Sequence, residues 1–148
     1  MRRRAGVDFP LWIAVGLIAL AAGAPAQGAG GGAVVIDDST PDLAQRERVY
    51  QVRLQHPTLE QLDGEITTLY WRIELAPSRE LPIIELCVAG YCDQLEMRRG
   101  ASNEFEGLPA DSNIEFRFMV PGRGMLQRPI RGGSLQLIVN YRQQTAGQ

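Results

Sequence analysis

The chain has 148 residues, enough for one domain and too few for two domains preceded by a leader. Apolar residues make up 45% of it, so a packed core is available and wholesale disorder is not expected. The formal net charge is −2, and it becomes −4 without residues 1–26, because Arg2, Arg3 and Arg4 outweigh Asp8 by two positive charges there. A mildly acidic domain has no electrostatic basis for binding nucleic acid.

Residues 1–26 have the pattern of an export signal. Three arginines open the chain, an apolar stretch runs from Leu11 to Ala22, and Ala24-Pro25-Ala26 places small residues where a signal peptidase cuts. An uncleaved anchor is the alternative, since the apolar stretch from Phe9 onward has the length for it, but no basic stop-transfer cluster follows. We expect cleavage after Ala26 and release into the periplasm without a stable membrane anchor.

The residues after the signal divide into three parts. Residues 27–33 are glycine-rich and are predicted to form a flexible lead-in. The folded domain is expected over residues 34–142, with a disordered tail over 143–148. Within the domain, residues 34–36 suit a short first strand, and the polar segment 42–48 has room for one helical turn.

Alternating apolar and polar residues predict most of the remaining elements. The expected strands cover residues 50–54, 68–75, 114–120 and 135–141, with a hairpin around the cysteines and a loop over 99–103. Turn signals recur at fairly regular intervals and helical periodicity is almost absent. The sequence therefore predicts an all-β fold, a small antiparallel β-sandwich of about seven to eight strands with one hairpin disulfide.

Cys87 and Cys92 are the only cysteines, and an even count in an exported chain favours a disulfide. A two-residue turn at Ala89-Gly90 would pair Cys87 with Cys92 across a hairpin, with their Cα atoms ~4.5 Å apart in a non-hydrogen-bonded pair. Ala-Gly is an unfavourable hairpin turn, because a type I′ turn needs a positive φ at Ala89. We interpret the bridge as a structural staple that holds a weakly specified turn.

The same alternation assigns the hairpin residues to two faces. The apolar face is expected to hold Ile84, Leu86, Val88, Leu95 and Met97, and the wetter face Glu85, Cys87, Cys92, Gln94 and Glu96. A redox-active role fits poorly, because such sites use two cysteines separated by two residues at a helix N-terminus. A metal site is not expected, since His56 is the only histidine and no four-ligand cluster exists.

No arrangement of residues predicts catalysis or a cofactor. His56 lies beside Pro57 without a recognisable nucleophile motif. Two binding surfaces remain as hypotheses: an exposed sheet edge, and the loop Pro121, Gly122, Arg123 and Gly124, which turn geometry alone would also explain. Tyr70 and Trp71 are adjacent in a strand and so face opposite sides, which argues against a sugar-stacking platform and places Trp71 in the core.

Several segments of the second half form a set with a defined order and spacing. They are Trp71-Arg72, Leu86-Cys87 with Cys92, the run from Phe116 to Leu126, and the run from Leu137 to Arg142. On these residues, which span about half of the chain, it resembles the flagellar protein FlhE family.

The resemblance implies a secreted periplasmic β-sandwich associated with flagellar assembly. Members of that family are linked to control of the flagellar type III export apparatus, where they limit proton leak, and to chaperoning the periplasmic rod. It therefore implies rod or export-gate proteins as partners, offers no catalytic residues, and supports a disulfide between Cys87 and Cys92. The family's loop tends towards Pro-Gly-Gly-Gly, so Arg123 places a charge where relatives present bare backbone.

Two functions of other classes stay open at this point. One is a periplasmic module that binds carbohydrate or another small ligand, which needs a concave aromatic face. The other is a protease inhibitor, for which the tip of the Cys87–Cys92 hairpin is the candidate contact.

Overall fold

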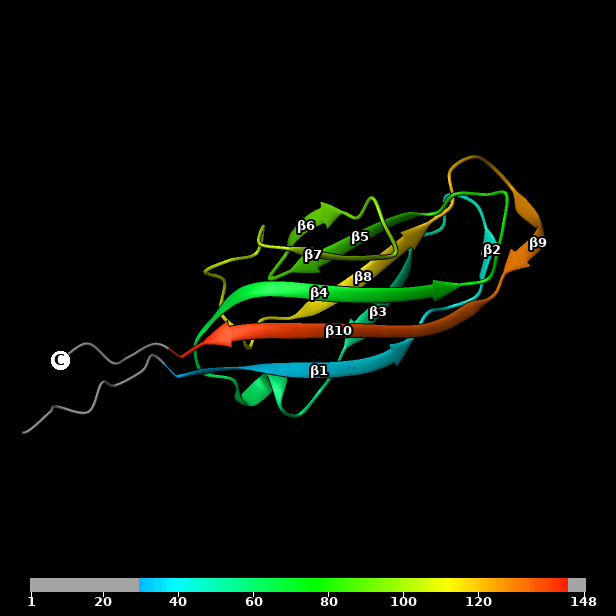
Figure 1. Cartoon of the computed structure of the whole chain (residues 1–148). Coiled ribbons are helices and arrows are strands. Elements are labelled where there is room, and N and C mark those ends of the chain that lie inside the picture. The colour runs from blue at the N-terminus through cyan, green and yellow to red at the C-terminus, as the bar shows by residue number, and fades with distance from the viewer. Residues whose placement is uncertain (1–29, 144–148) are drawn as a thin grey trace, which may run out of the picture.

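Two four-stranded antiparallel sheets lie face to face in the computed structural model, which describes residues 30–143 (Figure 1). One sheet has the order β1-β10-β4-β7 and the other β3-β8-β5-β6, while β2 and β9 pair separately. The strands are β1 (Gly31–Ser39), β2 (Leu43–Gln45), β3 (Tyr50–Leu54), β4 (Glu65–Leu75), β5 (Ile83–Val88), β6 (Tyr91–Gln94), β7 (Arg99–Ser102), β8 (Ile114–Met119), β9 (Met125–Ile130) and β10 (Gly132–Arg142). The predicted all-β sandwich is confirmed, but residues 30–143 form ten strands where seven to eight were expected, and one short 3₁₀ turn, η1 (Leu59–Gln61).

The core lies between the two sheets and follows the alternation of the sequence. Ile114, Phe116 and Phe118 of β8 are fully buried, and the Phe116 and Phe118 rings have their centroids 6.4 Å apart. Leu135, Leu137 and Val139 of β10 bury the facing side. Because a strand directs alternate side chains to opposite faces, one-sided strands of this kind are stable only when two sheets cover each other.

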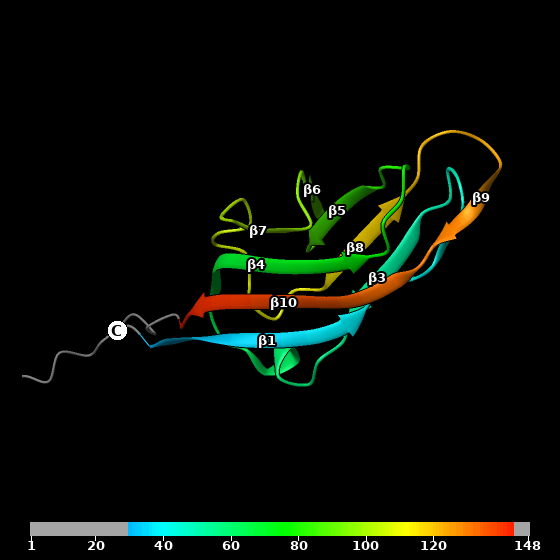
Figure 2. The same cartoon turned by 45° about the vertical axis from the view of Figure 1, so that its right-hand side comes forward.

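The small β2–β9 sheet projects beyond one end of the sandwich, as the two cartoons show (Figures 1 and 2). At the point where β1 leaves for β2, Thr40 is buried and donates its hydroxyl to the Glu74 carbonyl (2.8 Å), while it accepts the Gly133 N–H (2.6 Å). Gly132 lies against the same crossing, and a Cβ there would come within 1.9 Å of the Thr40 carbonyl oxygen. Only glycine fits this close approach of two backbones.

The first strand begins earlier than the sequence suggested. β1 starts at Gly31, so residues 31–33 of the expected flexible lead-in are paired with the end of β10. Pairing needs only backbone groups, and Gly31 can lie close to the Tyr141 carbonyl because it has no side chain. The expected signal segment 1–26 lies outside the described residues, as does the expected tail beyond Gln143.

Three other predictions for local structure were wrong. Residues 43–45, within the expected helical turn, form β2, because Leu43 is fully buried and pairs with Ile130. The expected loop at 99–103 contains β7, where Gly100 lies beneath the Trp71 ring. Strand β9 had no counterpart in the prediction, since Pro129 and two glycines obscured its pattern.

Candidate functional site

The β8–β9 connection is the loop that the sequence singled out as a partner contact. Pro121, Gly122, Arg123 and Gly124 are all exposed at the end of the molecule that carries the β2–β9 sheet. Gly122 has φ 101° and Gly124 φ 84°, conformations that side chains other than glycine rarely adopt. The two glycines therefore set the shape of the loop, and Arg123 is the side chain that it carries outward.

The loop is tied to the segment that follows β2. The Arg46 N–H donates to the Gly124 carbonyl and the Glu47 N–H to the Val120 carbonyl, both at 2.9 Å. The Arg46 guanidinium also donates to the Pro121 carbonyl at 3.3 Å. These three bonds hold both ends of the loop and fix its backbone.

A bidentate ion pair connects the Arg46 side chain, and through it the loop, to the β4–β5 connection. Arg46 donates to both carboxylate oxygens of Glu80, at 2.6 and 2.8 Å, and Glu80 lies in the β4–β5 connection. The hydrogen bonds from Arg46 lower the pKa of Glu80, and the carboxylate in turn raises the pKa of Arg46. The forked geometry is the strongest form of such a pair. The sequence did not reveal this brace, because 34 residues separate its partners.

The cystine hairpin has the predicted register. Cys87 pairs with Cys92 across β5 and β6, the disulfide joins them, and their Cα atoms are 4.0 Å apart. Ala89 has φ 50° and Gly90 φ 86°, the left-handed pair that a type I′ turn requires. The Ala89 N–H donates to the Asn113 carbonyl (3.0 Å), so the tip is also held by the connection before β8.

Two assignments of the hairpin faces need correction. Cys87 lies on the predicted face with Glu85 and Cys92, but it is 2% exposed and so not wet, because the bridge to Cys92 covers it. Met97 is 68% exposed, not apolar core, because β6 ends at Gln94 and the chain crosses to the other sheet. Trp71 is partly buried against the core, and its indole N–H donates to the Met97 carbonyl at 2.9 Å.

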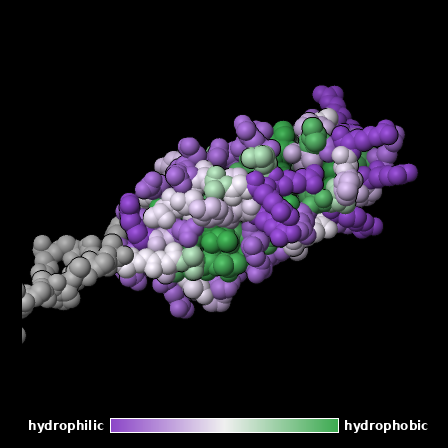
Figure 3. All heavy atoms as spheres, viewed as in Figure 1, coloured by the Kyte–Doolittle hydropathy of each residue, from purple (hydrophilic) through white to green (hydrophobic). Residues whose placement is uncertain are grey.

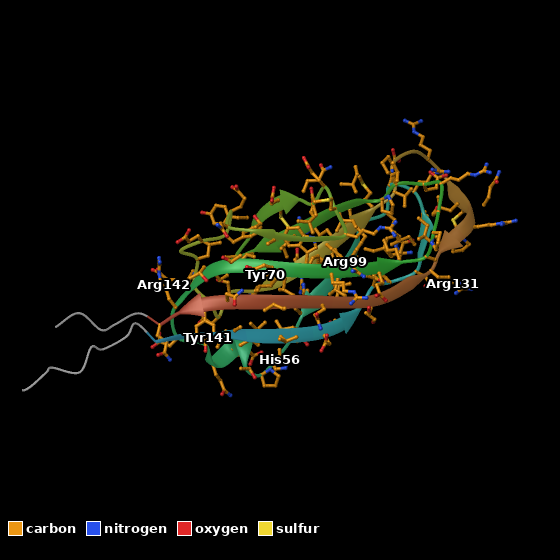
Figure 4. All side chains as sticks on the ribbon, in the orientation of Figure 1. His56, Tyr70, Arg99, Arg131, Tyr141 and Arg142 are labelled. Atoms are coloured by element: carbon orange, nitrogen blue, oxygen red, sulfur yellow. A yellow bond between two sulfur atoms is a disulfide. The ribbon has the colours of Figure 1, made fainter. Side chains whose placement is uncertain are left out.

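The residues considered for catalysis make local contacts. His56 follows β3 and accepts the Thr58 N–H at Nδ1 (3.2 Å), a turn contact; its side chain is labelled in Figure 4. Glu85 lies near the sulfur atoms of Cys87 and Cys92, but those atoms are bonded to each other and offer no thiolate to a metal. These groups support turns and strands in the described residues.

A shallow hollow of about 440 Å³ opens on the outer face of the β3-β8-β5-β6 sheet. It is lined by Val49, Gln51, Ile83, Glu85, Arg117 and Met119. None of these is aromatic, whereas a sugar site needs aromatic faces for stacking. Tyr70, by contrast, lies on the outer face of the other sheet (Figure 4). Across residues 30–143, no helix has the length and apolarity that a membrane crossing needs.

The fold and the loop define the class to which the molecule belongs, a small antiparallel β-sandwich with one hairpin disulfide and a braced loop at one end. The family model described as "Flagellar protein FlhE" matches residues 41–142. The chain therefore belongs to the FlhE family, as the resemblance predicted.

Individual relatives agree with this assignment. The chain is 33% identical to the flagellar protein FlhE of Escherichia coli (strain K12) over 86 residues, 57% of this chain and 66% of that protein. It is 34% identical to that of Salmonella typhimurium over 82 residues, 55% of this chain and 63% of the relative. Each match thus spans slightly less than two thirds of the relative. A solved structure described as "Crystal Structure of FLHE" superimposes with a TM-score of 0.69 at 30% identity, covering 77% of this chain and 99% of that one.

Proposed function

We propose that this chain is a non-catalytic periplasmic chaperone and regulator of flagellar rod assembly and of the flagellar type III export apparatus, in which it limits proton leak. The observation that carries the proposal is the match of residues 41–142 to the FlhE family. That match includes both ends of the braced loop and the whole cystine hairpin. The partners are flagellar rod proteins, export-gate proteins or both.

The disulfide supports the periplasm as the place of action. Cys87 and Cys92 are the only cysteines, and the hairpin brings them together in the folded chain. Disulfides persist in the bacterial periplasm, whereas the cytosol keeps thiols reduced. Export would depend on residues 1–26, whose sequence has the three parts of a signal peptide.

The braced loop supports action by binding. Arg46 and Glu80 fix the backbone of the Pro121–Gly124 loop before contact. A loop that is already ordered loses little conformational entropy on binding, so more of the contact energy appears as affinity. Arg123 would then be presented in one place, as a partner contact requires.

Deleting the gene in the source organism tests the proposal. We expect altered swimming or flagellar placement, restored by the full chain and not by a form that lacks residues 1–26, although both are expressed. Reduced proton leak in the restored strain would support the export-apparatus part of the proposal. Normal swimming, normal flagella and normal proton leak in the deletion strain would contradict it.

A further inference from the structure

Charge is unevenly distributed over the molecule. We call residues 41–48, 76–82 and 120–131 the arginine end, since they surround the β2–β9 sheet. This end holds six arginines and three acidic residues, a net +3, whereas the rest of residues 30–143 holds six arginines and thirteen acidic residues, a net −7. The space-filling view shows hydrophilic side chains extending outward from the same end, with hydrophobic patches between them (Figure 3).

Half of these arginines already have a partner. Arg46 pairs with Glu80, and Arg131 pairs with Asp42 at 2.6 Å. The Asp42 carboxylate also accepts the Gly132 N–H, which with Arg131 lowers the pKa of Asp42. The Arg48 guanidinium lies 5.0 Å from the centre of the Tyr50 ring.

Three arginines of this end, Arg79, Arg123 and Arg128, are exposed and make no ion pair within residues 30–143. They come from the β4–β5 connection, the β8–β9 loop and β9. Their charges are therefore available to an outside group.

Two of these arginines lie two residues before a large exposed apolar residue in the sequence. Leu81 is 79% exposed and lies two residues after Arg79, and Met125 is 67% exposed and lies two residues after Arg123. Arg46 joins the two segments, because it binds Glu80 in the first with its side chain and Gly124 in the second with its backbone N–H. Arg46 thus links the segments 79–81 and 123–125, which together carry two exposed cations and two exposed apolar side chains, and we treat the linked segments as one surface.

We propose that this surface binds an acidic protein segment that also carries apolar side chains. The inference rests on the proposed function and specifies the chemistry of the partner at the same loop. Guanidinium groups bind carboxylates through paired hydrogen bonds, and arginine and methionine are enriched in protein interfaces.

The sequence offers a matched control for this surface. Met97 and Arg99 have the composition and spacing of Arg123 and Met125 in reverse order, and Met97 is 68% exposed, but Met97 lies in the β6–β7 connection and Arg99 begins β7. The test variants are R123S/M125S and R79S/L81S, and the control is M97S/R99S. All are made in the oxidised full-length mature chain, and circular dichroism confirms that each is folded.

The binding probe is a synthetic fluorescent peptide of alternating glutamate and leucine blocks, measured by anisotropy. We expect wild type and the control to bind it, each test variant to bind roughly tenfold more weakly, and affinity to fall with added salt. A peptide with glutamine in place of glutamate should not bind. Equal binding by the glutamine peptide, equal loss in the control, or no binding by wild type would overturn the inference.

Two further measurements separate the other occupants. Sedimentation with phosphatidylglycerol vesicles that requires Arg123 and Met125 would overturn the inference in favour of a membrane. Self-association that both test variants abolish, followed by light scattering, would overturn it in favour of a second copy of this chain.

Complementation of the deletion strain keeps this inference separate from the proposed function. If wild type restores flagellation and the test variants restore it equally, the proposed function stands and the acidic-segment surface fails. If wild type itself restores nothing, because the deletion has no flagellar defect, the proposed function fails whatever the peptide shows. Restoration by wild type and by M97S/R99S, and by neither test variant, supports both.

Discussion

Removing the disulfide should cost a modest and calculable amount of stability. The bridge joins residues five apart, so it closes a loop of six residues. Closing such a loop removes about 7 cal/mol/K of chain entropy from the unfolded state, which is about 2 kcal/mol at 25 °C. Truncating the buried Cys87 side chain adds about 1 kcal/mol, as for the loss of one buried methyl-sized group.

The variant C87A/C92A is therefore expected to lose about 3 kcal/mol and to remain folded. For a domain of this size, that corresponds to a fall in Tm of roughly 10 °C. Denaturant unfolding followed by Trp71 fluorescence measures the loss, with an unchanged m-value showing that the native fold persists. The rest of β5 supports the fold, because it also pairs with β8 along six residues.

The turn inside the bridge provides an independent check of this reasoning. Ala89 has φ 50°, which costs an L-residue with a Cβ about 1–2 kcal/mol. Asparagine tolerates this conformation, so Ala89→Asn should stabilise the protein by about 1 kcal/mol, with or without the disulfide. A loss above 5 kcal/mol in C87A/C92A, or no gain from Ala89→Asn in either background, would refute the view that the bridge is a local staple over a strained turn.

Three further predictions concern the core, a backbone crossing and the braced loop. Phe116→Ala should cost about 3–5 kcal/mol in denaturant unfolding, since the ring is fully buried. Gly132→Ala should cost well over 1 kcal/mol, because the new Cβ would meet the Thr40 carbonyl oxygen. As pH falls below the ordinary pKa of Glu80, the protection factor of the Arg46 N–H in hydrogen exchange (its intrinsic rate at each pH divided by its observed rate) should fall. The pKa of Glu80 is lowered in the fold, so the pair's contribution is present above the unfolded value and is lost as pH falls through the folded one.

Controls for these predictions are present in the same chain. Tyr70→Ala changes an exposed aromatic residue and should stay within about 0.5 kcal/mol of wild type. Gly107→Ala introduces a Cβ into open space at φ 85°. Its effect on stability therefore measures the cost of a positive φ for alanine, without a steric clash between the Cβ and a neighbouring atom. Glu80→Gln should give a low protection factor at the Arg46 N–H that does not change over the same pH range. Equal costs at Gly107 and Gly132, or a pH dependence retained in Glu80→Gln, would contradict the assigned causes.

The sequence predicted the elements whose own residues show a recognisable pattern, such as apolar and polar residues that alternate along a strand. Strand β8 alternates strictly over Ile114–Met119, and its inward residues are buried as expected. The hairpin register followed from the spacing of the two cysteines, because a two-residue turn permits only one pairing. In both cases, residues within the element itself were sufficient to predict its structure.

The elements that depend on distant partners were missed. Strands β2 and β7 are short, and each exists because a longer or more distant strand pairs with it. The Arg46–Glu80 brace has no local signal, since either residue alone is typical of a solvated surface. The exposure of Met97 arises because the chain changes sheets after Gln94, which alternation within one strand does not reveal.

The most direct test of the account is whether this chain touches the flagellar basal body. Crosslinking in living cells, followed by purification of basal bodies, measures this through the recovery of the chain beside rod and export-gate proteins. The account predicts enrichment of wild type and of the M97S/R99S control in that fraction. Absence of wild type from basal bodies, while the oxidised chain is abundant in the same periplasm, would contradict it.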